Sequence, residues 1–142
     1  MDEKYVIDTS VALKWFLNDE SDTDKADLIQ EAFLKQEIDL IAPPHFSYEF
    51  ADALDKASRS NRIPAQEARQ AFRDFLQIAI PIQIQDNSEL LKTWDLQLSI
   101  KGRYYDMAFL ELALNSNCKV ITADVNFQSL DPQNIQLLSS LP

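Results

Sequence analysis

The stretch Tyr5-Val6-Ile7-Asp8-Thr9-Ser10 decides the fold of this chain of 142 residues. Three apolar, β-favouring residues run directly into an acid. Thr9 and Ser10 then offer hydroxyl groups of the kind that begin helices. A strand that passes at once into a helix starts a βαβ unit, and functional side chains of parallel sheets gather where such strands end. We therefore expect Asp8 at a functional edge of a parallel sheet.

Short apolar runs alternate with amphipathic helical patterns along the rest of the chain. Further strands are expected at 40–42, around 82–84, at 119–122 and, more weakly, at 135–138. Helices are expected at 11–17, 21–36, 45–60, 64–78, from 86 or 88 to 98, and at 104–114. This alternation is typical of an α/β domain in which a central parallel sheet of about four to five strands is covered by helices on both faces. Because no linker interrupts the pattern, residues 1–142 are expected to form a single domain.

The composition argues against several classes of protein. The single glycine, Gly102, does not allow a glycine-rich phosphate-binding loop, and the one cysteine, Cys118, has no partner for an internal disulfide. With no signal-peptide pattern and no long apolar run, we expect a cytoplasmic protein without a membrane segment. The net charge of −10 opposes general nucleic-acid binding, because cationic side chains normally neutralise the phosphates. A nuclease of this charge would depend on metal ions and on local basic patches.

Four acids stand at the ends of expected strands or in the first turns of expected helices: Asp8, Glu49, Asp106 and Asp124. Each has a structural alternative. Asp8 and Asp124 suit helix caps. Glu49 suits a pair with His45 one helical turn earlier, and Asp106 suits the positive end of a helix dipole. Taken together, however, the four positions predict one cluster of carboxylates.

A cluster of carboxylates is unfavourable unless cations or protons neutralise it. Ligand sets made only of oxygen suit Mg²⁺, with Mn²⁺ as the alternative. The chain offers only His45 and Cys118 for a zinc site, which is too few. A hard cation lowers the pKa of a bound water and stabilises the charge that develops at a reacting phosphate. The acids therefore predict metal-assisted cleavage of phosphodiester bonds.

Segments in three parts of the chain resemble the motifs of the PIN-domain ribonucleases and, within that family, of the VapC-like toxins of toxin–antitoxin pairs. They are Asp8–Phe16, Pro43–Leu54, and Tyr105–Ala113 followed by Val120–Asp124. The segments follow one another in the order of the family and span nearly the whole chain. The resemblance implies a PIN-like three-layer α/β/α fold. It also implies a Mg²⁺-dependent endoribonuclease, the toxin of such a pair.

The resemblance gives each acid a role. Asp8 and Asp106 would be the firmest metal ligands. Glu49 would bind the metal or orient the attacking water, and Asp124 would complete the site directly or through a water. The hydroxyl groups implied as supports for these carboxylates belong to Thr9, Ser10 and Thr122.

One position departs from the pattern of the family. Asp52 stands three residues after Glu49, where the second motif commonly has asparagine. The two acids share a helix face, so Asp52 would support a second metal or oppose RNA. The alternative is a surface pair between Asp52 and Lys56 at the i+4 position.

Two basic clusters lie near the motifs and are the candidate contacts to RNA phosphates. They are Lys56, Arg59 and Arg62 after the second motif, and Lys101 and Arg103 before the third. The alternative is a set of solvated surface charges, with Lys56 and Arg59 paired to Asp52 and Asp55.

Members of the family commonly form homodimers and hold an antitoxin in a groove between helices, so the resemblance implies both partners. The apolar stripes at 21–36 and 64–78 are the candidate surfaces, although such stripes usually face a core. Trp15 and Trp94 are expected in the core.

Two other functions compete with the ribonuclease. The first is a PIN domain of weak or no activity that works as a protein-binding module, which the charge of −10 and Asp52 leave open. The second is a phosphoacceptor signalling domain. That class requires adjacent acids after the first strand and a lysine after a late strand, and the chain has neither arrangement.

Overall fold

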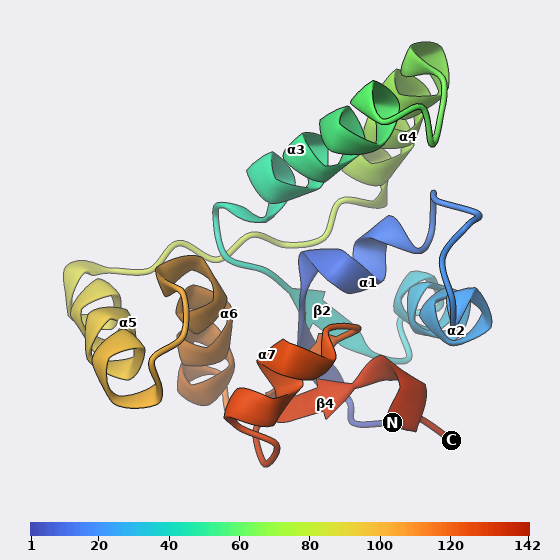
Figure 1. Cartoon of the computed structure of the whole chain (residues 1–142). Helices are drawn as coiled ribbons and strands as arrows, with labels where there is room; N and C mark the ends of the chain where they lie inside the picture. Colours follow the sequence, from blue (N-terminus) through green and yellow to red (C-terminus); the bar gives the residue numbers. More distant parts are fainter.

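The computed structural model describes residues 1–142 and places the sheet at the centre of the molecule (Figure 1). Its four strands are β1 (Lys4–Ile7), β2 (Asp39–Ile41), β3 (Lys119–Thr122) and β4 (Ile135–Leu137). They lie in the order β2-β1-β3-β4, and every pairing is parallel. Val6 lies opposite Ile41 on one side and Val120 on the other, so β1 is an interior strand. Its apolar residues are therefore buried on both faces, as the sequence predicts.

Seven helices surround the sheet. They are α1 (Thr9–Leu13), α2 (Thr23–Leu34), α3 (Phe46–Arg59), α4 (Ala65–Ile78), α5 (Asn87–Ile100), α6 (Tyr104–Asn115) and α7 (Val125–Leu130). Figure 1 shows α5 and α6 on one side of the sheet and α1 and α2 on the other. The expected three-layer α/β/α architecture is thus confirmed. None of the helices is both long and apolar enough to cross a bilayer.

Helices α3 and α4 form an antiparallel pair that extends beyond the sheet (Figure 1). Aromatic rings hold the pair together and join it to the segment after α1. Phe50 is fully buried, its ring stacks on that of Phe75 at 3.8 Å between centroids, and it meets the edge of Phe16 at 5.7 Å. Because Glu49 is the residue before Phe50, this packing fixes the helix that carries one of the four acids.

Helix α1 ends at Leu13, four residues before the expected end at Leu17. The chain continues in turns, and two side chains tie these turns to the start of α2. Lys14 Nζ donates to the carbonyl of Ser21 at 2.7 Å, and Trp15 Nε1 donates to the carbonyl of Ala26 at 2.8 Å. These long-range bonds replace the last turn of the expected helix.

The strand expected around 82–84 does not form. Ile82 makes one isolated parallel bridge to Ala42, with backbone bonds on both sides of it. Pro81 has no N–H group to donate, which limits a ladder at this point. The sheet therefore has four strands, the lower end of the expected range.

Helix α5 begins where one of the two expected caps lies. The Asp86 carboxylate accepts from the backbone N–H of Glu89 at 2.8 Å, and the Glu89 carboxylate accepts from the N–H of Asp86, which completes a capping box. The outer face of α5 differs from expectation, because Trp94 is 52% exposed and does not belong to the core.

Candidate metal centre

Asp8 follows β1 directly and is the most buried of the four acids, at 8% exposure. Ser10 Oγ donates to its Oδ2 at 2.6 Å, and Thr122 Oγ1 donates to the same oxygen at 2.8 Å. Asp8 occupies the N-cap position of α1 but makes no capping bond with its side chain. The capping alternative for Asp8 is therefore wrong, and its carboxylate is held by hydroxyl groups instead.

The same two hydroxyls connect the ends of β1 and β3. Ser10 Oγ accepts from the N–H of Ala123 at 3.0 Å, and Thr122 Oγ1 accepts from the N–H of Asp124 at 3.0 Å. Each hydroxyl thus donates to Asp8 and accepts from the chain that follows β3. The backbone around Asp124 is fixed relative to Asp8 as a result.

Glu49 reaches the site from the first turn of α3. Its Oε1 accepts from Thr9 Oγ1 at 3.1 Å, so a residue next to Asp8 holds it. His45 Nε2 lies 3.8 Å from the same oxygen, which is the pair expected from the i+4 spacing. Burial lowers the pKa of His45, so at neutral pH this imidazole supplies no full charge to Glu49.

Asp106 stands in the first turn of α6, three residues after Arg103. The loop before it approaches α6 closely, since a Cβ on Gly102 would lie 2.6 Å from Met107 Cε. A larger residue at this position would therefore require the flexible end of the Met107 side chain to move. Burial raises the pKa of both Asp106 and Glu49, and the Arg103 guanidinium offsets part of this rise, so Arg103 lies near both acids.

Asp124 lies after β3 and is exposed. Its Oδ1 accepts from the N–H groups of Asn126 and Phe127 at 2.9 and 3.3 Å, so Asp124 does cap α7. The capping alternative is confirmed for this acid. Both of these bonds end on Oδ1, so a ligand role for the other carboxylate oxygen stays compatible with the cap.

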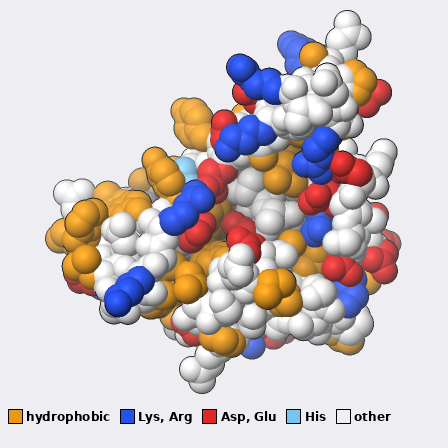
Figure 2. Space-filling model, viewed as in Figure 1, with side chains coloured by type: hydrophobic (Ala, Val, Ile, Leu, Met, Phe, Trp, Pro, Cys, Tyr) orange, Lys and Arg blue, Asp and Glu red, His pale blue; other side chains and the backbone are white.

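The four carboxylates act on one another electrostatically. Burial is the largest cause of the raised pKa of Asp8, Glu49 and Asp106, and the pKa of Glu49 rises to about 7. Nearby negative charge adds to each shift, from Asp124 on Asp8, from Asp8 and Asp106 on Glu49, and from Asp8 and Asp124 on Asp106. Figure 2 shows the acidic side chains that gather near the middle of this face. The four acids therefore lie within electrostatic reach of one another.

This cluster fits a hard cation by its donor chemistry, because every donor is an oxygen and the site carries excess negative charge. The side chains as they stand do not place three or more acids in a group arranged to hold a metal ion. A cation would thus have to draw the carboxylates together. Mutual repulsion of like charges is a physical reason for the open arrangement.

The two basic clusters differ in their surroundings. Lys56 pairs with Asp52 at 3.0 Å, Arg59 with Asp55 at 2.8 Å, and Arg62 with Asp19 at 2.7 Å. These pairs match the surface alternative for this cluster and for Asp52, whose side chain is 63% exposed. The charge of Arg103 instead favours the ionised form of Asp106. Lys101 stands two residues before Arg103, at the end of α5.

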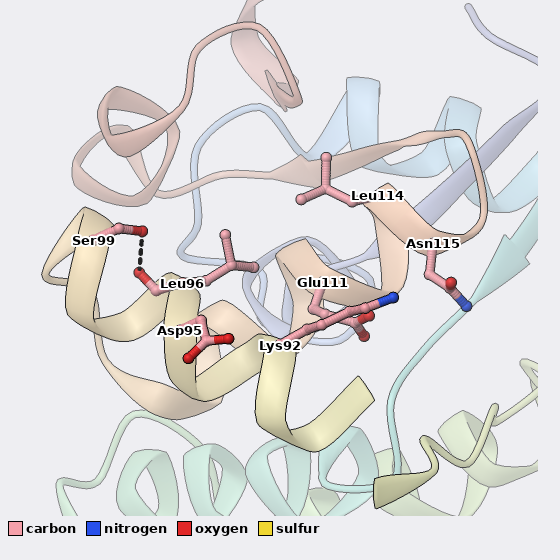
Figure 3. A pocket seen from close by; sticks show the side chains of 7 residues that line it. All are labelled: Lys92, Asp95, Leu96, Ser99, Glu111, Leu114 and Asn115. Carbon is pink, nitrogen blue, oxygen red and sulfur yellow. Dashed lines mark hydrogen bonds between the residues drawn. The ribbon is translucent and has the colours of Figure 1, made fainter. Parts of the chain in front are cut away.

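A separate cavity of about 510 Å³ lies between α5 and α6 (Figure 3). Lys92 and Asp95 from α5 and Glu111 from α6 line it, and none of the four clustered acids does. Glu111 is 3% exposed, and burial raises its pKa although Gln85 donates to it. The cavity is therefore distinct from the candidate metal centre.

A model of the PIN domain family matches residues 5–132 of the chain. The chain belongs to the PIN-domain family. The match covers all four clustered acids, β2, β3 and all of β1 except Lys4, and it ends before β4. No curated protein sequence matches the chain.

Three solved structures share the fold of this PIN domain. PAE2754 from Pyrobaculum aerophilum is 14% identical with a TM-score of 0.71, over 96% of this chain and 90% of that one. VapC20 from Mycobacterium tuberculosis, described as a toxin that cleaves the sarcin-ricin loop, is 11% identical with a TM-score of 0.64, over 89% and 95%. VapBC2 from Rickettsia felis, bound to a promoter DNA fragment, is 13% identical with a TM-score of 0.64, over 94% and 98%.

Sequence reasoning missed two residues beside the site of this PIN domain. Tyr48 and Tyr105 each directly precede one of the acids, and their side chains are 81% and 56% exposed. Periodicity gives no reason to single them out, because an aromatic residue in an apolar helix is normally assigned to the core. The available signal was their place in the sequence, one residue before Glu49 and one before Asp106.

Proposed function

We propose that this PIN domain is a metal-dependent endoribonuclease, the toxin of a toxin–antitoxin pair, with Mg²⁺ as its cofactor and Mn²⁺ as a substitute. One observation carries the proposal: carboxylates from the end of β1 and the first turns of α3 and α6 are brought together beside Asp124, and burial, with nearby negative charge, raises the pKa of Asp8, Glu49 and Asp106. Uncompensated buried acids of this kind mark functional sites. The likeness of the fold to VapC20 supports the choice of RNA as substrate.

Asp8 and Asp106 would hold the metal most firmly, with Glu49 and Asp124 completing its ligands. When bound, the cation supplies an activated water and stabilises charge on the reacting phosphate. Side chains of the protein would position the metal ligands and the attacking water. Ser10 and Thr122 keep Asp8 in position. Glu49 Oε1, held by Thr9 Oγ1, would orient the attacking water and accept its proton where Glu49 does not itself bind the metal.

RNA hydrolysis by the purified chain tests the proposal directly. The full chain, separated from any bound antitoxin, is incubated with a mixture of cellular RNA and with Mg²⁺, Mn²⁺ or EDTA. We expect endonucleolytic products with either metal and none with EDTA. Intact RNA under every metal condition would contradict the proposed activity.

Metal binding has a readout that does not require activity. We expect Mg²⁺ at about 100 times its dissociation constant to stabilise the wild-type protein by about 2.7 kcal/mol, measured by thermal unfolding. Asp8→Asn should lose most of this response. Asp52→Asn is the matched control, because Asp52 is exposed and pairs with Lys56. An equal response in Asp8→Asn and the wild type would exclude Asp8 as a ligand.

Without metal, the stability of the protein should fall as the pH rises. A carboxyl whose pKa is raised in the folded state opposes folding when it ionises. For Glu49, this cost appears between its unfolded pKa of 4.5 and its folded pKa of about 7. Stability without metal should therefore fall as the pH rises through this range, and less so in Glu49→Gln.

Charge reversal also distinguishes between the two basic clusters as candidate contacts to RNA. We propose that Arg103 and Lys101 guide RNA phosphates to the acids, since Arg103 already acts on two of them. Reversing both charges with glutamate should weaken RNA binding by about tenfold or more at low salt, while Mg²⁺ stabilisation persists. Reversing Lys56 and Arg59, which are ion-paired, is the control and should cost less. Unchanged RNA affinity after reversal at 101 and 103 would remove this role.

The proposal includes a cognate antitoxin, a homodimer and a cytoplasmic location. The likeness to VapBC2 supports an antitoxin partner. Several large apolar side chains on α5 are exposed, which supports a protein interface on this helix. These are Leu90, Leu91, Trp94 and Leu98.

A protein-binding module without useful nuclease activity is the second candidate. It is favoured by the open arrangement of the acids, which do not form a ready metal-binding group. The net charge of −10 also favours it, because it opposes RNA. Metal-induced stabilisation without RNA cleavage would support this second candidate over the first.

A further inference from the structure

Two exposed tyrosines stand next to acids of the candidate metal centre in the sequence. Tyr48 is 81% exposed on α3 and Tyr105 is 56% exposed on α6, yet both helices bury neighbouring aromatic residues in the core. Tyr48 directly precedes Glu49, and Tyr105 directly precedes Asp106. Large aromatic side chains usually bury most of their surface, so two exposed rings beside one site are informative.

His45 connects the two tyrosines. Its ring lies 5.0 Å from that of Tyr105 between centroids, and its Nε2 lies 3.1 Å from the Tyr105 carbonyl oxygen. Phe109 meets the other edge of the imidazole at 4.8 Å. Tyr48 follows His45 by three residues on α3, which places it one turn away on the same side of that helix. In Figure 2, orange hydrophobic side chains and red acidic ones gather around the pale blue histidine.

The electrostatics of the chain make stacking the more effective source of affinity for a nucleic acid. Phosphates approaching this site meet four acids and a net charge of −10. Among the predicted phosphate contacts, only Arg103 offsets part of the negative charge of Glu49 and Asp106. Stacking of bases on aromatic rings does not depend on charge neutralisation, and every base has a face that can stack. A base inside a duplex is already stacked on its neighbours, so an unpaired base is the better ligand.

We propose that Tyr48 and Tyr105 are stacking platforms for unpaired bases on either side of the phosphodiester that reaches the acids. This inference rests on the proposed nuclease function and assigns two of its substrate-positioning residues. Tyr105 contacts the ring of His45, and His45 Nε2 lies 3.8 Å from Glu49 Oε1, so a base stacked on Tyr105 lies close to this acid. Tyr48 stands one turn after His45 on α3 and offers a second exposed ring on the same side of that helix. A protein seated on both rings would cover the acids, which favours RNA as the occupant.

Alanine and phenylalanine variants test the stacking. Binding of a short single-stranded RNA labelled with one 2-aminopurine is measured by fluorescence in EDTA, so that no cleavage occurs. We expect Tyr48→Ala and Tyr105→Ala each to weaken binding by about tenfold and to remove 2-aminopurine quenching. Tyr48→Phe and Tyr105→Phe should restore both. Trp94→Ala, which removes an exposed aromatic ring on α5, is the matched control and should bind as the wild type does.

The steady-state kinetics extend the test to catalysis. Both alanine variants should raise KM by a similar factor and change kcat by less than about threefold, because the rings position the substrate and do not touch reacting atoms. Wild-type binding and quenching in both alanine variants would overturn the inference, as would equal affinity for a duplex of the same sequence. A change of oligomeric mass in these variants would also overturn it, since the rings would then belong to a protein interface.

The outcomes separate this inference from the proposed function. Cleavage by the wild type together with unaffected binding in the alanine variants would leave the nuclease and remove the stacking platforms. Tyrosine-dependent quenching without cleavage under any metal condition would leave the platforms and remove the nuclease.

Discussion

Asp106→Asn is expected to lower kcat/KM for RNA cleavage by about a thousandfold or more. Loss of a metal ligand removes several kcal/mol of stabilisation of the charged transition state, and each 1.36 kcal/mol is about tenfold in rate. Asp106 is well suited to this test because it is part of a helix whose interior is packed independently of the acid. Single-turnover cleavage with saturating Mg²⁺ is the measurement.

Glu111→Gln is the matched control for Asp106→Asn. Both acids lie on α6 and burial raises the pKa of both, but Glu111 lines the cavity between α5 and α6 and not the cluster. Its replacement should leave cleavage within about threefold of the wild type, as expected for a residue that makes no contact with the reacting atoms. Equal losses in the two variants would mean that α6 tolerates neither change, and the ligand role of Asp106 would lose its support.

The positions of the acids were predictable because they follow from local pattern. A strand that ends at Asp8 and a strand that ends just before Asp124 must bring the two acids to the same edge once the strands pair in parallel. The hydroxyls at Ser10 and Thr122 follow from the same register, since Ile7 lies opposite Ile121. Short stretches of sequence are therefore sufficient to predict this part of the site.

Other features depend on contacts that no local pattern specifies. Trp94 lies on a helix that packs only one face against α6, and its exposure depends on where α5 comes to rest. The run at Ile82 reads as a strand by composition, but Pro81 and the path of the chain limit it to one bridge. The pairing of Arg62 with Asp19 joins residues far apart in sequence, so only the folded chain shows it.

Phe50→Ala is expected to destabilise the protein by about 3–5 kcal/mol, which is a large fraction of the total stability of a domain. The side chain is fully buried between Phe75, whose ring is parallel to it at 3.8 Å, and Phe16. Truncation leaves a cavity at the only point where α3, α4 and the segment after α1 share one set of rings. Urea unfolding followed by circular dichroism measures the loss.

Phe72→Ala is the control that separates burial from aromatic composition. Phe72 stacks more loosely, 6.3 Å from Phe50, and is only half-buried, so its removal should cost clearly less. Phe50→Leu keeps most of the volume and should recover a large part of the loss. Because Glu49 precedes Phe50 on α3, the alanine variant should also weaken metal-dependent cleavage at temperatures where it remains folded. A loss below about 1 kcal/mol for Phe50→Ala would contradict the view that these rings fix α3 and its acid.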